Sequence, residues 1–129
     1  MASYLMLFRG GDIAARGWSP EETGAYYQSW EDWGQQLRDT GIWIAGHPLQ
    51  DEGRVLGPEP SVVTDGPFAE TKEVLGGYIL FEAADMDEAE RVARGCPIFH
   101  VSGRVEVRPV VERGLCSAAS DAESLRASL

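Results

Sequence analysis

The sequence predicts an α+β fold in which two helices cover one antiparallel sheet. Residues 4–8 and 78–81 are short, uniformly apolar runs with the length and composition of central strands. Two other segments carry helix-start signals followed by apolar residues at helical spacing. The predicted order along the chain is strand, helix, strand, hairpin, strand, helix, strand.

The first helix is expected to begin after Ser19, because Ser19, Pro20 and Glu22 form a capping box with proline at the first helical position. Gly41 is expected to end it. Four aromatic or aliphatic residues recur at helical spacing in this segment: Tyr26, Trp30, Trp33 and Leu37. They would lay a stripe on the sheet, and this pattern favours a core role over a ligand cage.

The second strand is predicted at residues 42–45, and Gly46-His47-Pro48 is expected to break it. Residues 54–56 and 61–64 bracket a loop rich in glycine and proline. This pattern predicts a short excursion that returns the chain to the sheet before Asp65.

The second helix is expected to begin near Asp85, since Asp85 and Glu88 have capping-box spacing, and Gly95-Cys96-Pro97 should end it. Its predicted apolar face comprises Met86, Ala89, Val92 and Ala93. The last strand places Val105 and Val107 on one face and Glu106 and Arg108 on the other.

This order of elements is that of a ferredoxin-like βαββαβ sandwich, with both helices on one face of the sheet. The other face would be bare, although residues 78–81 are apolar at every position. A second copy of the chain is the simplest cover, which predicts a homodimer.

The composition and charge of the chain limit the kinds of partner it could bind and the cellular location that we expect for it. The 129 residues are 43% apolar, enough for one domain with a core, and no apolar run approaches the length of a membrane span. A formal charge of −10 repels phosphate backbones and argues against nucleic-acid binding. The start of the chain lacks a basic, apolar leader, so we expect a cytoplasmic protein. Residues 1–112 are predicted to be the domain and residues 113–129 a Ser- and Ala-rich tail, loosely ordered or docked on a partner.

Two cysteines and two histidines are too few, and wrongly spaced, for a zinc site, so no metal and no other cofactor is expected. Cys96 and Cys116 are expected to be reduced thiols.

Residues 63–73 contain the most distinctive motif of the chain. Gly66 permits backbone angles closed to other residues and Pro67 fixes its own φ, so the Asp65 carboxylate would be held at a strand end. The same residues suit an ordinary structural turn. The residues alone therefore leave a functional site and a turn as alternatives.

The run Val63-Thr64-Asp65-Gly66-Pro67-Phe68-Ala69-Glu70-Thr71-Lys72-Glu73 resembles the DGPF motif of the YCII-related family of small bacterial proteins. Other segments are similar to that family in order and spacing: Arg9-Gly10-Gly11-Asp12, Ser19-Pro20-Glu21-Glu22, Gly76-Gly77-Tyr78 and Val105-Glu106-Val107-Arg108-Pro109. The resemblance implies a homodimer whose two sheets face each other as a dimeric α/β barrel, an architecture related to muconolactone isomerases and monooxygenases.

The resemblance does not supply a complete catalytic pair. Shorter relatives carry a histidine in the first helix that is proposed to act with an aspartate. In this chain Trp30 stands near that position, and the first helix contains no histidine. The dyad therefore cannot be carried over, and what remains is an aspartate in an aromatic-lined cavity.

Asp65 is the leading candidate for acid/base chemistry, because Phe68 beside it could exclude water. His47 comes next, although a solvated loop imidazole is the simpler interpretation of both His47 and His100. Further candidates for binding a substrate come from the first helix and from three predicted strands: Trp30, Tyr78, Arg9 and Arg108. Arg9, Glu106 and Arg108 could meet across neighbouring strands, or hold an anionic ligand together.

Three classes of function remain open. The first is a cofactor-independent enzyme in which Asp65 moves a proton on a small organic substrate. The second is a ligand-binding or accessory module, since members of the resembling family often occur beside sigma-factor genes. The third is a structural dimer without a small-molecule site.

Overall fold

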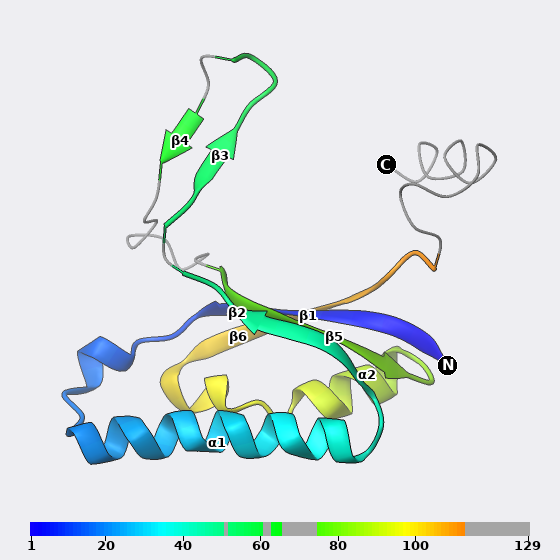
Figure 1. Ribbon diagram of the computed structural model, residues 1–129, viewed down its shortest axis with the longest axis horizontal. Helices are drawn as coiled ribbons and strands as arrows, with labels where there is room; N and C mark the ends of the chain where they lie inside the picture. The colour runs from blue at the N-terminus through cyan, green and yellow to red at the C-terminus, as the bar shows by residue number, and fades with distance from the viewer. Residues whose placement is uncertain (51, 61–62, 66–74, 113–129) are drawn as a thin grey trace.

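Four antiparallel strands form the central sheet in the order β2-β5-β1-β6, and both helices lie on one face of it (Figure 1). The computed structural model describes residues 1–50, 52–60, 63–65 and 75–112, with only the backbone of residues 63–65. The elements of the sheet and its cover are β1 (Ala2–Gly10), α1 (Pro20–Asp39), β2 (Trp43–Pro48), β5 (Leu75–Ala83), α2 (Met86–Ala93) and β6 (Gly103–Pro109). Two short 3-10 helices, η1 (Ile13–Arg16) and η2 (Pro97–Val101), complete this layer. The predicted ferredoxin-like α+β fold is confirmed.

The capping box places the start of α1 as predicted. The Ser19 side chain accepts a hydrogen bond from the Glu22 amide, and the Glu22 carboxylate accepts one from the Ser19 amide. At the other end Gly41 has a φ of 79°, a left-handed angle that glycine adopts without strain. Asp85 caps α2 in the same way by accepting from the Glu88 amide.

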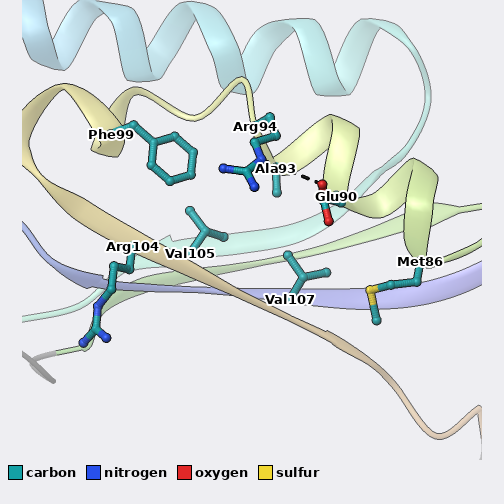
Figure 2. A pocket seen from close by; sticks show the side chains of 8 residues that line it. All are labelled: Met86, Glu90, Ala93, Arg94, Phe99, Arg104, Val105 and Val107. Carbon is teal, nitrogen blue, oxygen red and sulfur yellow. Dashed lines mark ion pairs between the residues drawn. The ribbon is translucent and has the colours of Figure 1, made fainter.

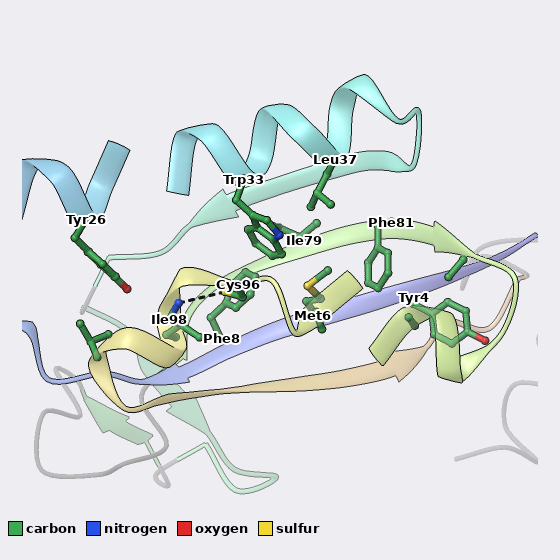
Figure 3. Packing of buried hydrophobic residues seen from close by; sticks show 14 residues of the cluster. Tyr4, Met6, Phe8, Tyr26, Trp33, Leu37, Ile79, Phe81, Cys96 and Ile98 are labelled. Atoms are coloured by element: carbon green, nitrogen blue, oxygen red, sulfur yellow. Dashed lines mark hydrogen bonds between the residues drawn. The ribbon is translucent and has the colours of Figure 1, made fainter. Parts of the chain in front are cut away.

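The core lies between the helices and one face of the sheet (Figure 3). Alternation along β1 buries Tyr4, Met6 and Phe8 against the helices, and β5 contributes Ile79 and Phe81 to the same layer. From α1 the buried residues include Tyr26, Trp33 and Leu37, with Trp30 half-buried against them. The predicted stripe is therefore core.

The second strand differs from the prediction, because β2 continues through Gly46 and His47 to Pro48 instead of ending at Ala45. β2 is an edge strand, where a proline removes no hydrogen bond from the sheet if its nitrogen faces outward. A register shift between Trp43 and Ala45 marks an irregularity in the same strand.

The predicted return to the sheet before Asp65 was wrong. β3 (Arg54–Leu56) and β4 (Val63–Asp65) pair with each other as a separate two-stranded ribbon, with Asp65 opposite Arg54. The chain rejoins the main sheet at Leu75. Figure 1 shows the ribbon projecting from the side of the sheet that the helices leave bare.

That bare face carries the half-buried side chains of Leu5, Leu7 and Leu80, which alternate with the core residues of β1 and β5. One helix prediction was also wrong in detail: Met86 is 42% exposed, because it stands at the first residue of α2 and beyond the edge of the core. Within the described residues, neither helix has the length and hydropathy needed to cross a bilayer.

Candidate functional site

A cavity of about 850 Å³ opens between α1, from Gly24 to Arg38, and the end of the sheet where β1 and β2 finish and β5 begins. Its wall on the helix side comes from α1, and its floor comes from β2 and β5. The residues of the wall and floor used below are Phe8, Tyr27, Trp30, Trp33, Trp43, Gly46, His47, Gly77 and Tyr78.

Aromatic rings form most of the wall. Trp30 packs edge to face on Phe8, with ring centroids 5.0 Å apart, and on Trp33 at 5.7 Å. Trp43 closes the β2 side, where the Arg38 guanidinium lies 4.3 Å from the centroid of its ring. A small ring-shaped organic molecule would therefore find flat apolar surfaces and one cation at the rim.

The floor has no side chains at two positions, for reasons of packing. A Cβ on Gly46 would lie 2.8 Å from the Trp43 ring, and one on Gly77 would lie 2.9 Å from the carbonyl oxygen of His47. These glycines let the indole of Trp43 lie across β2 and let the two strands approach. A side chain at either position would therefore collide with the floor of the cavity.

The main polar pair of the cavity is formed by His47 and Tyr78. His47 Nδ1 lies 2.8 Å from the Tyr78 hydroxyl, and the two residues are register partners in β2 and β5. His47 therefore lies in a strand and not in the loop that the simpler interpretation expected, and cross-strand pairing holds its imidazole although the residue is exposed. One ring nitrogen is engaged by the phenol, which is the arrangement that orients an imidazole for proton transfer through its other nitrogen.

The predicted residues Trp30 and Tyr78 reach the cavity from opposite faces of the sheet. Ile79 points toward the helices, so its neighbour Tyr78 points to the bare face, as does His47, the register partner of Tyr78. The cavity extends past the β2 edge and touches both sides. Sequence reasoning named both residues but could not assign their faces, because residues 78–81 are apolar throughout.

Arg9 and Arg108 lie away from this cavity, on the bare face at the β1–β6 side. Arg9 Nε is 3.2 Å from Glu106 Oε1, and Arg108 lies 3.7 Å from the other carboxylate oxygen. The predicted meeting of these three charges occurs. They form an ion-pair cluster and do not line the aromatic wall.

The backbone of Asp65 ends β4, and residues 66–74 connect it to Leu75 at the start of β5. The side chain of Asp65 and the whole of Phe68 lie outside the described residues, so their place in the site stays a prediction. His100 falls in η2 and is exposed. Sequence reasoning missed Arg38 and Tyr27, although the spacing of Tyr27 to Trp30 and Gly34 on α1 points to this side of the helix.

The described part of the chain shows neither a metal-binding cluster nor a reactive thiol. No cluster of three or more histidine, cysteine or acidic residues there could hold a metal ion. Burial raises the pKa of the Cys96 thiol to about 12, so this cysteine is an inert core residue. Burial also raises the pKa of Tyr26.

Comparison with known proteins agrees with this architecture. The family model of the YCII-related domain matches residues 4–113. An uncharacterized protein of Rhizobium meliloti (strain 1021) is 49% identical over 51 residues, which are 39% of this chain and 41% of that protein. The chain thus aligns with less than half of the length of this relative.

A solved structure has the same fold. The 5-chloro-2-hydroxyhydroquinone dehydrochlorinase of Burkholderia phenoliruptrix, in complex with 2,5-dihydroxybenzoquinone, aligns with a TM-score of 0.51 and 14% identity. The alignment covers 89% of this chain and 99% of that enzyme. At this identity the likeness concerns the fold alone.

Proposed function

The chain belongs to the YCII-related family, and from that premise we propose that it binds a small organic molecule in the α1 cavity and transfers a proton on it without a cofactor. The observation that carries the proposal is the combination of an aromatic wall with the oriented His47–Tyr78 pair at one cavity. A pocket of this size with few, converging polar groups is typical of small-molecule sites.

In this proposal Asp65 is the acid/base group, and the His47–Tyr78 pair anchors or protonates the ligand. In the sequence, residues 66–74 separate Asp65 from β5, whose residues Gly76, Gly77 and Tyr78 line the cavity. Phe68, Trp30 and Tyr78 are proposed to bind the substrate, while Arg9 and Arg108 would serve an anionic group on the bare face.

The test uses the tryptophans as reporters. Trp30, Trp33 and Trp43 line the cavity, whereas Trp18 does not. Titration with 2,5-dihydroxybenzoquinone, followed by calorimetry and tryptophan fluorescence, starts from the ligand of the structurally similar enzyme and extends to other small hydroxylated aromatics. Trp30→Phe should weaken binding, and Trp18→Phe should leave it unchanged. Equal effects of the two substitutions would place any binding elsewhere.

A non-catalytic binding or accessory role is the second candidate, because the same walls serve binding without turnover. Product analysis of the bound compounds separates the two: conversion supports the enzyme, and tight binding with unchanged ligand supports the binding module. If the protein binds none of these compounds, the result would favour the third class of function, a structural dimer without a small-molecule site.

We further propose that the bare face of the sheet is covered by a second copy. The half-buried Leu5, Leu7 and Leu80 supply an apolar surface on central strands, where an unpaired monomer would expose it to water. The β3–β4 ribbon projects on the same side and carries Leu56, which is 72% exposed.

A further inference from the structure

The two edges of the sheet differ in how open they are to pairing. On the β2 edge, a register shift after Trp43 and a terminal Pro48 interrupt regular pairing. The β6 edge pairs with β1 from Tyr4 opposite Pro109 to Gly10 opposite Gly103 without any shift. β6 is therefore a straight edge strand, and no described strand lies on its outer side.

Hydrogen bonding to β1 fixes which groups of β6 face outward. The Val110 amide donates to the Ser3 carbonyl at 2.9 Å. Because amides alternate in direction along a strand, the amides of Arg104, Glu106 and Arg108 also face β1, and those of Gly103, Val105 and Val107 face away from it. The nitrogen of Pro109 faces away from β1, so its missing N–H removes no hydrogen bond between β6 and β1.

An apolar groove of about 440 Å³ runs beside this edge, between β6 and the end of α2 (Figure 2). Val105 and Val107 form one side, and Phe99, Ala93 and Met86 form most of the other. Glu90 and Arg94 also line the α2 side, where their side chains pair with each other at 3.9 Å. Phe99 is 40% exposed, so this groove leaves apolar surface in water beside an open strand edge. Arg104 points away from the groove toward the other side of the sheet.

The charges on β6 select among the ways in which two copies of this edge could pair antiparallel. A two-fold axis at Glu106 or Arg104 would set like charges opposite each other. An axis at Val105 sets Arg104 opposite Glu106 of the second copy, twice. An axis at Val107 also matches charges but places Pro109 at a hydrogen-bonding position, where it has no N–H to donate.

We propose that β6 pairs with β6 of a second copy, antiparallel about Val105, and that this interface is separate from the cavity and from the bare face. Val105 then meets Val105 of the second copy as a hydrogen-bonded pair, and Gly103 meets Val107. The two grooves join into one apolar surface that buries Phe99 from both copies. With the bare face also paired, two kinds of two-fold interface would assemble dimers into a tetramer.

Disulfide trapping tests the register. In a Cys116→Ser background, Val105→Cys places two thiols on residues whose Cα atoms are about 5.5 Å apart in such a pair, within disulfide range. The matched control is Val107→Cys, which would be roughly 13 Å from its own copy in this register. Mild oxidation should convert most of Val105→Cys, and little of Val107→Cys, to a covalent dimer on denaturing gels. Equal or slower cross-linking of Val105→Cys overturns the proposal.

Charge reversal in the Val105→Cys protein tests the partner. Arg104→Glu places glutamates opposite each other at both ends of the pair, and we expect cross-linking to slow by about tenfold or more. Cross-linking of Arg104→Glu as fast as the parent, with a circular dichroism spectrum that matches the parent, overturns the charge-matched register.

Discussion

At the scale of single residues, the positions of His47 and Tyr78 on neighbouring strands determine how their side chains are oriented. His47 is held by Tyr78 across two strands, so its imidazole is oriented at a cavity although it is exposed. Sequence reasoning selected His47 for its place after Gly46 but expected a loop. The phenol partner could not be foreseen, because cross-strand register depends on the irregularity at Trp43, which leaves no plain mark in the sequence.

Asp65→Asn tests the proposed acid/base group. The amide keeps the shape of the side chain and removes its charge, so folding should persist while turnover of any ligand found in the screen falls by about a hundredfold or more, as for loss of a general base. Thermal unfolding and steady-state kinetics are the measurements. Tyr78→Phe serves as the comparison, because it removes the hydroxyl that contacts His47 and leaves the Asp65 carboxylate in place. An Asn variant with normal binding and turnover would reduce the motif to a structural turn.

The buried thiol of Cys96 predicts a loss of stability in alkali. The thiol of an unfolded chain releases its proton near its ordinary pKa of 9.0, whereas the folded protein holds it to about 12. Between these values the unfolded state binds fewer protons, so the free energy of unfolding falls as pH rises, by at most about 1.4 kcal/mol per pH unit from this group.

Urea unfolding at pH 8, 9, 10 and 11 measures the slope. Cys96→Ala should be less stable at pH 8, because it leaves a small cavity, but its stability should fall less steeply above pH 9. Burial also raises the pKa of Tyr26, with a smaller contribution from Cys96, so Tyr26 adds a loss above pH 10 that differs between the two proteins. The slopes are therefore compared between pH 8 and pH 10. Parallel slopes for the two proteins would mean that Cys96 is not shielded from water.

At the scale of elements, sequence reasoning predicted correctly those features that depend on residues close together in the chain. The capping box at Ser19 and the Asp85 cap, which accepts from the Glu88 amide, set the starts of α1 and α2 as expected, because both partners lie within one turn. The β3–β4 ribbon was misplaced, since only tertiary packing decides whether a short strand joins the main sheet or pairs with its neighbour.

Gly24 and Gly46 differ in whether the structure has room for an added methyl group. Gly24 lies in α1 with nothing within 4 Å of the position that an added methyl group would take, so Gly24→Ala should raise the free energy of unfolding by about 0.5–1 kcal/mol through helix propensity. Gly46→Ala would press a methyl group against Trp43 and Ile79 and should cost about 1–3 kcal/mol. Urea unfolding of both variants gives the comparison. Stabilisation by Gly46→Ala would contradict the close packing of Trp43 on β2.

At the scale of the whole molecule, the sheet is one-sided within a protomer. Its helix face is filled by aromatic residues, while Leu5, Leu7 and Leu80 stand half-buried on the other face beside the Arg9–Glu106–Arg108 cluster. The uniformly apolar run 78–81 already indicated this from the sequence, because a strand covered on one face alone would alternate. The location of the cavity could not be predicted in the same way, since it depends on the gap that α1 leaves above the end of the sheet.

The bare face predicts a homodimer that a single charge can separate. Leu80 lies on the central strand β5, and Leu80→Lys would place an ammonium group in an apolar interface without a partner, which is costly. The same lysine in a monomer would lie in water and leave the fold intact. Light scattering at micromolar concentration should therefore show that the parent protein is a dimer or a larger assembly. The Leu80→Lys variant should form a smaller assembly, because this interface is lost, and its circular dichroism spectrum should be unchanged. Tyr27→Lys, on the exposed side of α1, is the matched control and should assemble like the parent. A parent protein that is already monomeric, or a Leu80→Lys variant that assembles normally, would mean that water covers this face of the sheet.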